Sequence, residues 1–169
     1  KWKHECKILA NFVALIHRLS VVFPEKKFIL RPHPGENPDT YRAVFKDVKN
    51  VLIEKRGSVS AWIIASDLLI HDGCTTAVEA YSAEIPIINY KSEFDPIFDI
   101  ELPNQLGVRC EKEEEVIDVI KKIDKKPKLF AKVNSLSDAS LSIFKNLNSD
   151  TYDDFMSLFR KLVKEKFES

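Results

Sequence analysis

The residues best suited to chemistry follow a short apolar run, 68–70, in the segment His71-Asp72-Gly73-Cys74-Thr75-Thr76-Ala77-Val78-Glu79-Ala80. An apolar run that stops at a glycine and is followed by hydroxyl residues and helix formers predicts a strand, a tight turn and the start of a helix. The N–H groups of a first helical turn have no partner within the helix and carry partial positive charge. With the hydroxyls of Thr75 and Thr76, they would bind a phosphate or a carboxylate. The alternative is that Gly73 only turns the chain and Thr75 only caps the helix.

A second candidate stretch, Pro32-His33-Pro34-Gly35-Glu36-Asn37-Pro38, follows the predicted strand 27–31. Its prolines fix their own φ angles and restrict the residues before them, so His33 lies on a stiff backbone. An imidazole there can donate to a phosphate oxygen, and Arg31 can add a bidentate contact. Ligands of parallel α/β sheets collect at the carboxyl ends of the strands, so both stretches are expected at one rim. The alternative is a proline-rich loop with a surface histidine.

A third stretch, Lys55-Arg56-Gly57-Ser58, follows the predicted strand 50–54 and belongs to the same rim. Arg56 could reach a ligand phosphate, although a basic residue at a rim is more often only solvated. Ser58 resembles the N-cap of the helix that runs through 62–64. Cys74 has no neighbouring base in the sequence, so we do not expect it to act as a nucleophile.

These stretches need a regular α/β framework to position them. Apolar residues at helical spacing predict helices over 8–23, 39–48, 77–82, 113–123 and 151–167. Short apolar runs predict strands at 27–31, 50–54, 68–70, 84–90 and 107–110. Strands alternating with helices call for right-handed crossovers. We therefore predict a Rossmann-like, doubly wound parallel sheet of about five strands flanked by helices. Residues 91–104 are expected to form a loop at the same rim.

Composition favours one domain and local recognition. With 169 residues and 44% hydrophobic content, the chain can fill one core, so we predict a single domain over 1–169 with helix 151–167 packed on it. Lys plus Arg equals Asp plus Glu at 26 each, which predicts no nucleic-acid partner. Three cysteines in no metal-binding pattern favour reduced thiols and a cytoplasmic location. Polar residues interrupt the apolar stretch 8–23, so we expect no membrane span or signal segment.

The motifs together resemble the C-terminal, nucleotide-binding half of a GT-B glycosyltransferase. The resemblance covers roughly residues 25–110 and is carried by Arg31-Pro32-His33-Pro34, Arg56-Gly57-Ser58-Val59, the 71–80 segment and Glu84-Ile85-Pro86-Ile87-Ile88-Asn89-Tyr90. The most similar group is that of bacterial surface-carbohydrate proteins related to capsule, sialic-acid and Kdo transferases. In those families a His-Pro pair and a downstream Ser/Thr pair bind the phosphate of a CMP-sugar.

The resemblance implies roles for particular residues. It places His33, with Pro34, and the pair Thr75 and Thr76 at the donor phosphate, and Glu79 at the nucleotide ribose. His33 is the expected catalytic residue, because preorganised donors at the leaving phosphate stabilise the transition state. The further expected ligand-binding residues are Arg31, Arg56, Ser58, Asp72, Gly73 and Cys74. No Asp/Glu cluster has metal-ligand spacing, so we expect no metal and no cofactor besides the nucleotide-sugar substrate.

A GT-B enzyme has two Rossmann-like domains, and this chain has room for one. The chain begins with Lys, so we expect a fragment of a longer, two-domain transferase, whose N-terminal domain would bind a glycan or lipid-linked acceptor. The full-length protein would be cytoplasmic and peripheral at the inner membrane. The alternatives are a nucleotide-sugar 2-epimerase, a CDP-glycerol-type polyol-phosphate transferase, or a non-catalytic α/β domain used for assembly.

Overall fold

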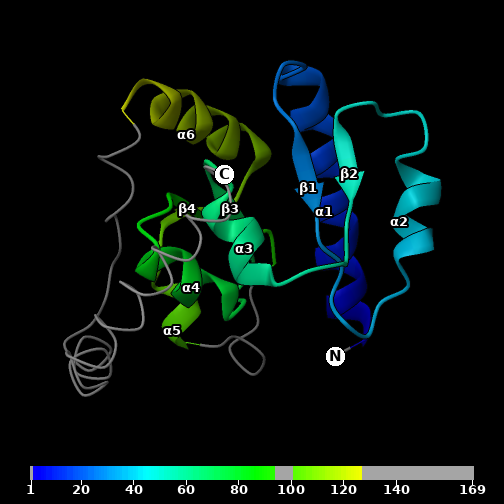
Figure 1. Ribbon diagram of the computed structural model, residues 1–169, viewed down its shortest axis with the longest axis horizontal. Coiled ribbons are helices and arrows are strands. Elements are labelled where there is room, and N and C mark those ends of the chain that lie inside the picture. Colours follow the sequence, from blue (N-terminus) through cyan, green and yellow to red (C-terminus); the bar gives the residue numbers. More distant parts are fainter. Residues whose placement is uncertain (1, 94–100, 127–169) are drawn as a thin grey trace, which may run out of the picture. The chain divides into compact units, whose positions relative to one another are not determined.

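The computed structural model describes residues 2–93 and 101–126, and its helices and strands alternate along the chain (Figure 1). In order, they are α1 (Trp2–Val22), β1 (Phe28–Leu30), α2 (Pro38–Val44), β2 (Val51–Ile53), α3 (Val59–Ile64), β3 (Leu69–His71), α4 (Thr76–Ser82), β4 (Ile87–Tyr90), α5 (Glu101–Asn104), β5 (Val108–Cys110) and α6 (Glu113–Lys125). Every strand pairing within these two ranges is parallel. This confirms the predicted Rossmann-like α/β class.

The strands are divided between two sheets, whereas the sequence predicted one. One sheet has the order β1-β2 and the other the order β3-β4-β5. The chain divides in the same place into two compact units, unit 1 (residues 1–57) and unit 2 (residues 58–169), and each is described by itself. That residues 1–169 make a single domain stays a prediction. The predicted helix 151–167 and part of the predicted loop 91–104 lie outside the described residues, and the end of that loop forms α5.

In unit 1, helices α1 and α2 lie beside the paired strands β1 and β2 (Figure 1). The core contains Tyr41, Phe45 and Ile53, with residues of α1, β1 and β2 packed against them. Helix α2 starts where Asn37 accepts the Asp39 amide at 3.0 Å. A proline at the first helical position is already fixed at a helical φ, which suits this start. The predicted helix 39–48 therefore exists, but it is shorter at its C-terminal end.

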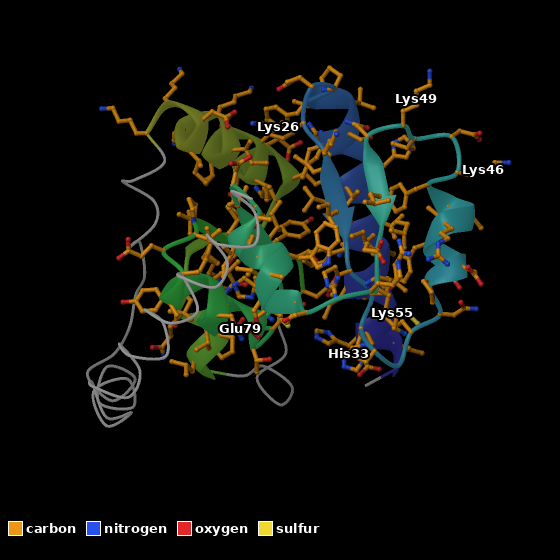
Figure 2. The ribbon with its side chains drawn as sticks, in the orientation of Figure 1. Lys26, His33, Lys46, Lys49, Lys55 and Glu79 are labelled. Atoms are coloured by element: carbon orange, nitrogen blue, oxygen red, sulfur yellow. The ribbon has the colours of Figure 1, made fainter. Side chains whose placement is uncertain are left out.

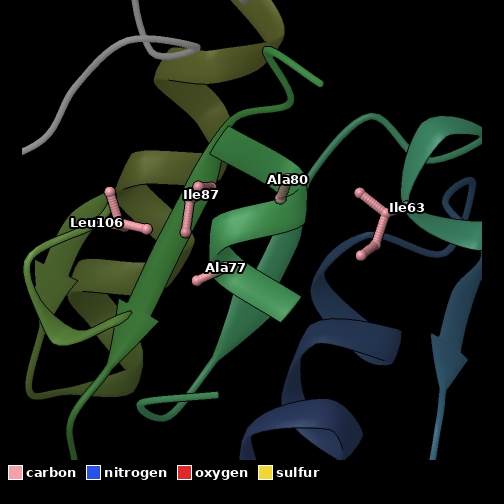
Figure 3. Close-up of a cluster of buried hydrophobic side chains, with 5 residues drawn as sticks. All are labelled: Ile63, Ala77, Ala80, Ile87 and Leu106. Atoms are coloured by element: carbon pink, nitrogen blue, oxygen red, sulfur yellow. The ribbon is translucent and has the colours of Figure 1, made fainter. Parts of the chain in front are cut away.

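In unit 2, β4 lies between β3 and β5 and is buried along its whole length. Its core cluster is Ile63, Ala77, Ala80, Ile87 and Leu106, drawn from α3, α4, β4 and the turn before β5 (Figure 3). Gly107, at φ +86°, makes this packing possible, because a Cβ there would lie 2.4 Å from the Ile87 carbonyl oxygen. Helix α6 buries Val116, Ile117 and Ile120, as its spacing predicted.

Candidate functional site

Buried polar side chains gather at the carboxyl ends of the strands. Among the described residues, the buried polar or charged side chains are Ser20, Glu54, His71, Asn89 and Lys91. All but Ser20 lie in the last two residues of β2, β3 or β4 or directly after one of these strands. Burying a polar group is costly unless it is paired. The carboxyl ends of the strands are therefore where each unit tolerates this cost.

His71 ends β3 and organises the turn that follows it, residues 72–76. Its Nδ1 accepts the Cys74 amide at 3.3 Å, so the neutral imidazole carries its proton on Nε2. That Nε2 is buried without a hydrogen-bond partner. Burial, opposed by the Leu106 backbone and assisted by the charge of Lys91, lowers the pKa of His71 to about 4. His71 is therefore an uncharged support of the turn at neutral pH.

Gly73 allows α5 to approach the 72–76 turn. Its φ is +63°, and an added Cβ would lie 3.0 Å from the Asn104 Oδ1 atom. Asn104 is in turn held by the buried Asn89, whose Nδ2 donates to the Asn104 carbonyl at 2.9 Å. Sequence reasoning predicted Gly73 but missed both asparagines. The sequence signal for Asn89 was a lone amide within an otherwise apolar strand.

Asp72 and Lys91 form an ion pair directly after β3 and β4. Their side chains are 11% and 3% exposed, respectively. Asp72 was predicted as a ligand-binding residue, whereas Lys91 was missed. The signal for Lys91 was available, because a lysine that follows a buried strand at the same edge as Asp72 can reach it.

The residues predicted to contact phosphate occupy the outer part of the turn. Cys74 and Thr75 are exposed, and Thr76 is half-buried. Thr75 is the N-cap of α4, but its side chain makes no capping hydrogen bond, so the capping interpretation of its hydroxyl is not supported. Further along α4, Glu79 accepts a hydrogen bond from the Ser60 hydroxyl of α3 at 2.5 Å. Sequence reasoning placed Glu79 at a ribose and did not foresee Ser60 as its partner.

In unit 1, His33 is exposed on the loop after β1, beside Lys55 (Figure 2). Its Nδ1 accepts the Gly35 amide at 3.2 Å, and its own amide donates to Glu36 Oε2 at 2.6 Å. The neutral ring therefore carries its proton on Nε2. Lys55 donates to the carbonyls of Pro34 and Glu36 at 2.7 and 2.9 Å. The loop thus holds His33 through hydrogen bonds as well as prolines, with a donor nitrogen available to a ligand.

Arg31 and Arg56 make contacts within unit 1. The Arg31 guanidinium donates to the carbonyls of Arg56 and Gly57 at 2.9 and 3.1 Å. Arg56 donates to both carboxylate oxygens of Glu54, which lowers the pKa of Glu54 to about 2. Both arginines thus hold the loop after β2 in place through hydrogen bonds, a role that the sequence did not predict. Their contact with a ligand stays a prediction. Ser58 is the N-cap of α3, as predicted, although without a side-chain capping bond.

The predicted site residues fall in both units. Unit 1 holds Arg31, His33, Pro34 and Arg56, and unit 2 holds Ser58, Asp72, Gly73, Cys74, Thr75, Thr76 and Glu79. Within each unit they follow the carboxyl ends of strands, as expected from a parallel sheet. Their assembly into one rim stays a prediction, as do their roles.

Within 2–93 and 101–126, no group of three or more His, Cys, Asp or Glu side chains is arranged to hold a metal ion. That the reaction needs no metal stays a prediction. In the same ranges, no helix combines the length and apolar character that a membrane crossing requires.

Comparison with known proteins bears on the fold. No protein-family model and no curated protein matches the chain. Among solved structures, it is similar to UDP-GlcNAc 2-epimerase from Neisseria meningitidis bound to UDP-GlcNAc, with a TM-score of 0.54 and 16% identity over 81% of this chain and 40% of that one. A GtfA/B complex aligns with a TM-score of 0.49 and 12% identity over 95% of this chain and 33% of that one. That score is too low to carry an argument.

The chain therefore spans less than half the length of these neighbours. At 16% identity, the similarity to the epimerase shows the fold alone. The fold is that of a GT-B-like, Rossmann-type α/β half.

Proposed function

We propose that this chain is the donor-binding half of a GT-B glycosyltransferase of bacterial surface polysaccharide biosynthesis, and that its donor is a CMP-sugar. The observation that carries the proposal is the 72–76 turn. The turn follows a parallel strand, and the neutral His71 accepts a hydrogen bond from its Cys74 amide. Thr75 is exposed to solvent, and its side chain makes no capping hydrogen bond. A turn built in this way supplies hydroxyl and amide donors to a phosphate.

Each unit is proposed, by itself, to carry donor groups for an anionic ligand. In unit 2, these are the hydroxyls of Thr75 and Thr76. In unit 1, it is the Nε2–H group of His33, whose orientation as a donor follows from the Gly35 amide at Nδ1. When a sugar leaves its nucleotide, negative charge develops on the phosphate, so donors held in place stabilise the transition state more than the bound substrate. The acceptor is proposed to be a glycan or lipid-linked sugar bound by a further domain.

The proposal is tested by calorimetric titration of the protein with CMP, CDP, UDP and GDP. CMP is expected to bind best, and both His33→Ala and Thr76→Ala are expected to weaken it by about tenfold, the usual effect of losing one charge-assisted hydrogen bond. His17→Ala and Thr40→Ala are matched controls, because both residues are exposed on helices of unit 1. Equal binding by the unmodified protein and all four variants would refute the assigned contacts. Absence of any nucleotide binding would refute the proposed function.

A nucleotide-sugar 2-epimerase is the second candidate, and the fold similarity to UDP-GlcNAc 2-epimerase favours it. The two functions differ in their need for an acceptor. Incubation with UDP-GlcNAc alone, followed by NMR of the sugar protons, would show a new epimer only if the protein is an epimerase. Preference for UDP over CMP in the titration would point the same way. A CDP-glycerol-type transferase would instead prefer CDP, and an assembly domain would bind none of the four nucleotides.

A further inference from the structure

The loop after β1 contains a four-residue turn, 33–36, that is exposed and yet held by several hydrogen bonds. Its residues His33, Pro34, Gly35 and Glu36 are all exposed. The Glu36 amide donates to the His33 carbonyl at 2.8 Å, and the Glu36 carboxylate accepts the His33 amide at 2.6 Å. Surface loops are ordinarily more mobile than the elements they connect. Because this turn buries none of its side chains, the bonds fix its conformation rather than add to a core.

Glu36 connects the turn to the core of unit 1. Its side chain is hydrogen-bonded to Tyr41 of α2, and burial together with this contact raises the pKa of the tyrosine hydroxyl. Tyr41 belongs to the core cluster of unit 1, with 6% of its surface exposed. The carboxylate that accepts the His33 amide is thus itself held by a buried residue.

Lys55 holds the same turn from the end of the neighbouring strand. It follows β2, whereas the turn follows β1, and its ammonium group donates to the carbonyls of Pro34 and Glu36 at 2.7 and 2.9 Å. An ammonium group has three N–H donors, so one lysine can bridge both carbonyls. The turn is therefore held at both ends, by Glu36 at the His33 amide and by Lys55 at the two carbonyls.

The contact of Lys55 with Pro34 bears directly on the imidazole. The Pro34 carbonyl and the Gly35 amide belong to one planar peptide unit, in which the C=O and N–H bonds point in opposite directions. A donor that holds the carbonyl therefore also aims the N–H. That N–H donates to His33 Nδ1 at 3.2 Å. The neutral ring then carries its proton on Nε2, which makes this nitrogen a donor.

We propose that Lys55 is a positioning residue for His33. By holding the Pro34 carbonyl, it aims the Gly35 amide at Nδ1 and keeps the ring as a hydrogen-bond donor through Nε2. Lys55 acts through His33 and does not itself contact the ligand. That the group accepting from Nε2 is a nucleotide phosphate rests on the proposed function. The positioning of the ring does not, because it concerns contacts within unit 1.

The first test is NMR of the full chain at pH 8 without a ligand. In Lys55→Met, the Gly35 amide should exchange with solvent about fivefold faster, because its bond to Nδ1 is no longer held in place. The ring nitrogens of His33 should show a larger share of the tautomer with the proton on Nδ1. Lys49→Met is the matched control, since Lys49 is exposed in unit 1 and the same charge is removed (Figure 2). Its Gly35 and His33 signals should equal those of the unmodified protein.

Two further variants of Lys55 sharpen this test. Lys55→Arg should keep the Gly35 exchange rate near its original value, because a guanidinium can donate to two carbonyls, as Arg31 does in the same unit. Should Lys55→Met not fold, Lys55→Gln replaces it with the same expected result, because its amide ends one bond short of the lysine nitrogen. Unchanged Gly35 and His33 signals in the variant without the ammonium group would overturn the inference.

The second test is a double-mutant cycle on CMP affinity, measured by calorimetry. Lys55→Met should weaken binding by about fivefold in the unmodified protein and should have no further effect in a His33→Ala background. Equal weakening in both backgrounds would mean that Lys55 attracts or contacts the nucleotide directly, which would overturn the inference. Equal weakening by Lys55→Met and Lys49→Met would overturn it as well, because charge alone would then explain the effect.

The two tests separate this inference from the proposed function. If the Gly35 and His33 signals change in Lys55→Met while no protein binds a nucleotide, the positioning role stands and the proposed function fails. If CMP binds the unmodified protein while Lys55→Met alters neither the signals nor the affinity, the proposed function stands and the positioning role fails.

Discussion

His71 should make the stability of unit 2 strongly dependent on pH. Its side chain is 4% exposed, its Nδ1 is occupied by the Cys74 amide, and the Leu106 backbone offsets only part of the cost of burying an added charge. Burial therefore lowers its pKa from the ordinary 6.5 to about 4. In the unfolded chain the same imidazole titrates near 6.5. Between these values the unfolded chain binds a proton that the folded protein excludes.

The sign and size of the effect follow from this difference. Stability rises with pH wherever the unfolded state binds more protons, so the contribution of His71 is intact above 6.5 and is lost as the pH falls to 4. One proton difference corresponds to about 1.4 kcal/mol per pH unit. Over the interval from 6.5 to about 4, the free energy of unfolding should fall by about 3 kcal/mol through this residue. This is a large part of the stability of an ordinary domain.

The assay is urea unfolding between pH 7.5 and 4.5, followed by the fluorescence of Trp62 in a Trp2→Phe background. Trp62 lies in α3, within the same unit as His71. His71→Asn keeps an acceptor near the position of Nδ1 but cannot be protonated, so its unfolding free energy should lose most of this pH dependence. His33→Asn, which changes an exposed histidine of unit 1, is the control and should behave as the unmodified protein does. Parallel curves for the unmodified protein and His71→Asn would refute the reasoning.

Three other perturbations test the packing and the loop contacts. Gly107→Ala should destabilise unit 2 by more than about 2 kcal/mol, because its Cβ would lie 2.4 Å from the Ile87 carbonyl oxygen. Gly35→Ala is the control and should be tolerated, because the nearest atom to its Cβ would be 3.5 Å away. Thermal unfolding of the two variants measures the difference. Arg31→Met removes donors to the carbonyls after β2, so amides 55–57 should exchange hydrogen faster while those of α6 do not change. Leu106→Ala leaves a cavity at a fully buried position and should lower the free energy of unfolding, measured with urea, by about 2–5 kcal/mol. A decrease of less than about 1 kcal/mol would contradict the described core.

Local patterns predicted most elements of the fold. Apolar runs bounded by turn residues located all five strands of the described residues, and the inward residues of α6 followed helical spacing. The division into two sheets was not predictable in this way. An apolar run indicates that a strand is buried, but it does not specify which other strand it pairs with. The same run at 28–30 is compatible with a two-stranded or a five-stranded sheet.

The sequence predicted where the candidate site residues lie along the chain better than it predicted what their side chains contact. Placing Arg31 after a strand correctly located its backbone, but a guanidinium on a long side chain can reach either a ligand or the carbonyls of the next loop. His71 begins the 71–80 segment but was given no role, and Lys91 was missed. Each is a single polar residue at the end of an apolar run, a pattern that is typical of a strand leaving the core. Their importance depends on burial, which only the packed structure supplies.

The distribution of these buried polar groups is itself an argument for function. An unpaired polar atom in the core lowers stability by about 1–3 kcal/mol, so a fold under selection for stability alone would replace it by an apolar residue. Unit 2 retains an unpaired Nε2 on His71, an unpaired Oδ1 on Asn89 and a buried charge on Lys91, all beside the 72–76 turn. The rest of its described core is apolar. Polar burial confined to the edge where ligands bind in parallel sheets is the expected mark of a site whose geometry matters more than its contribution to stability.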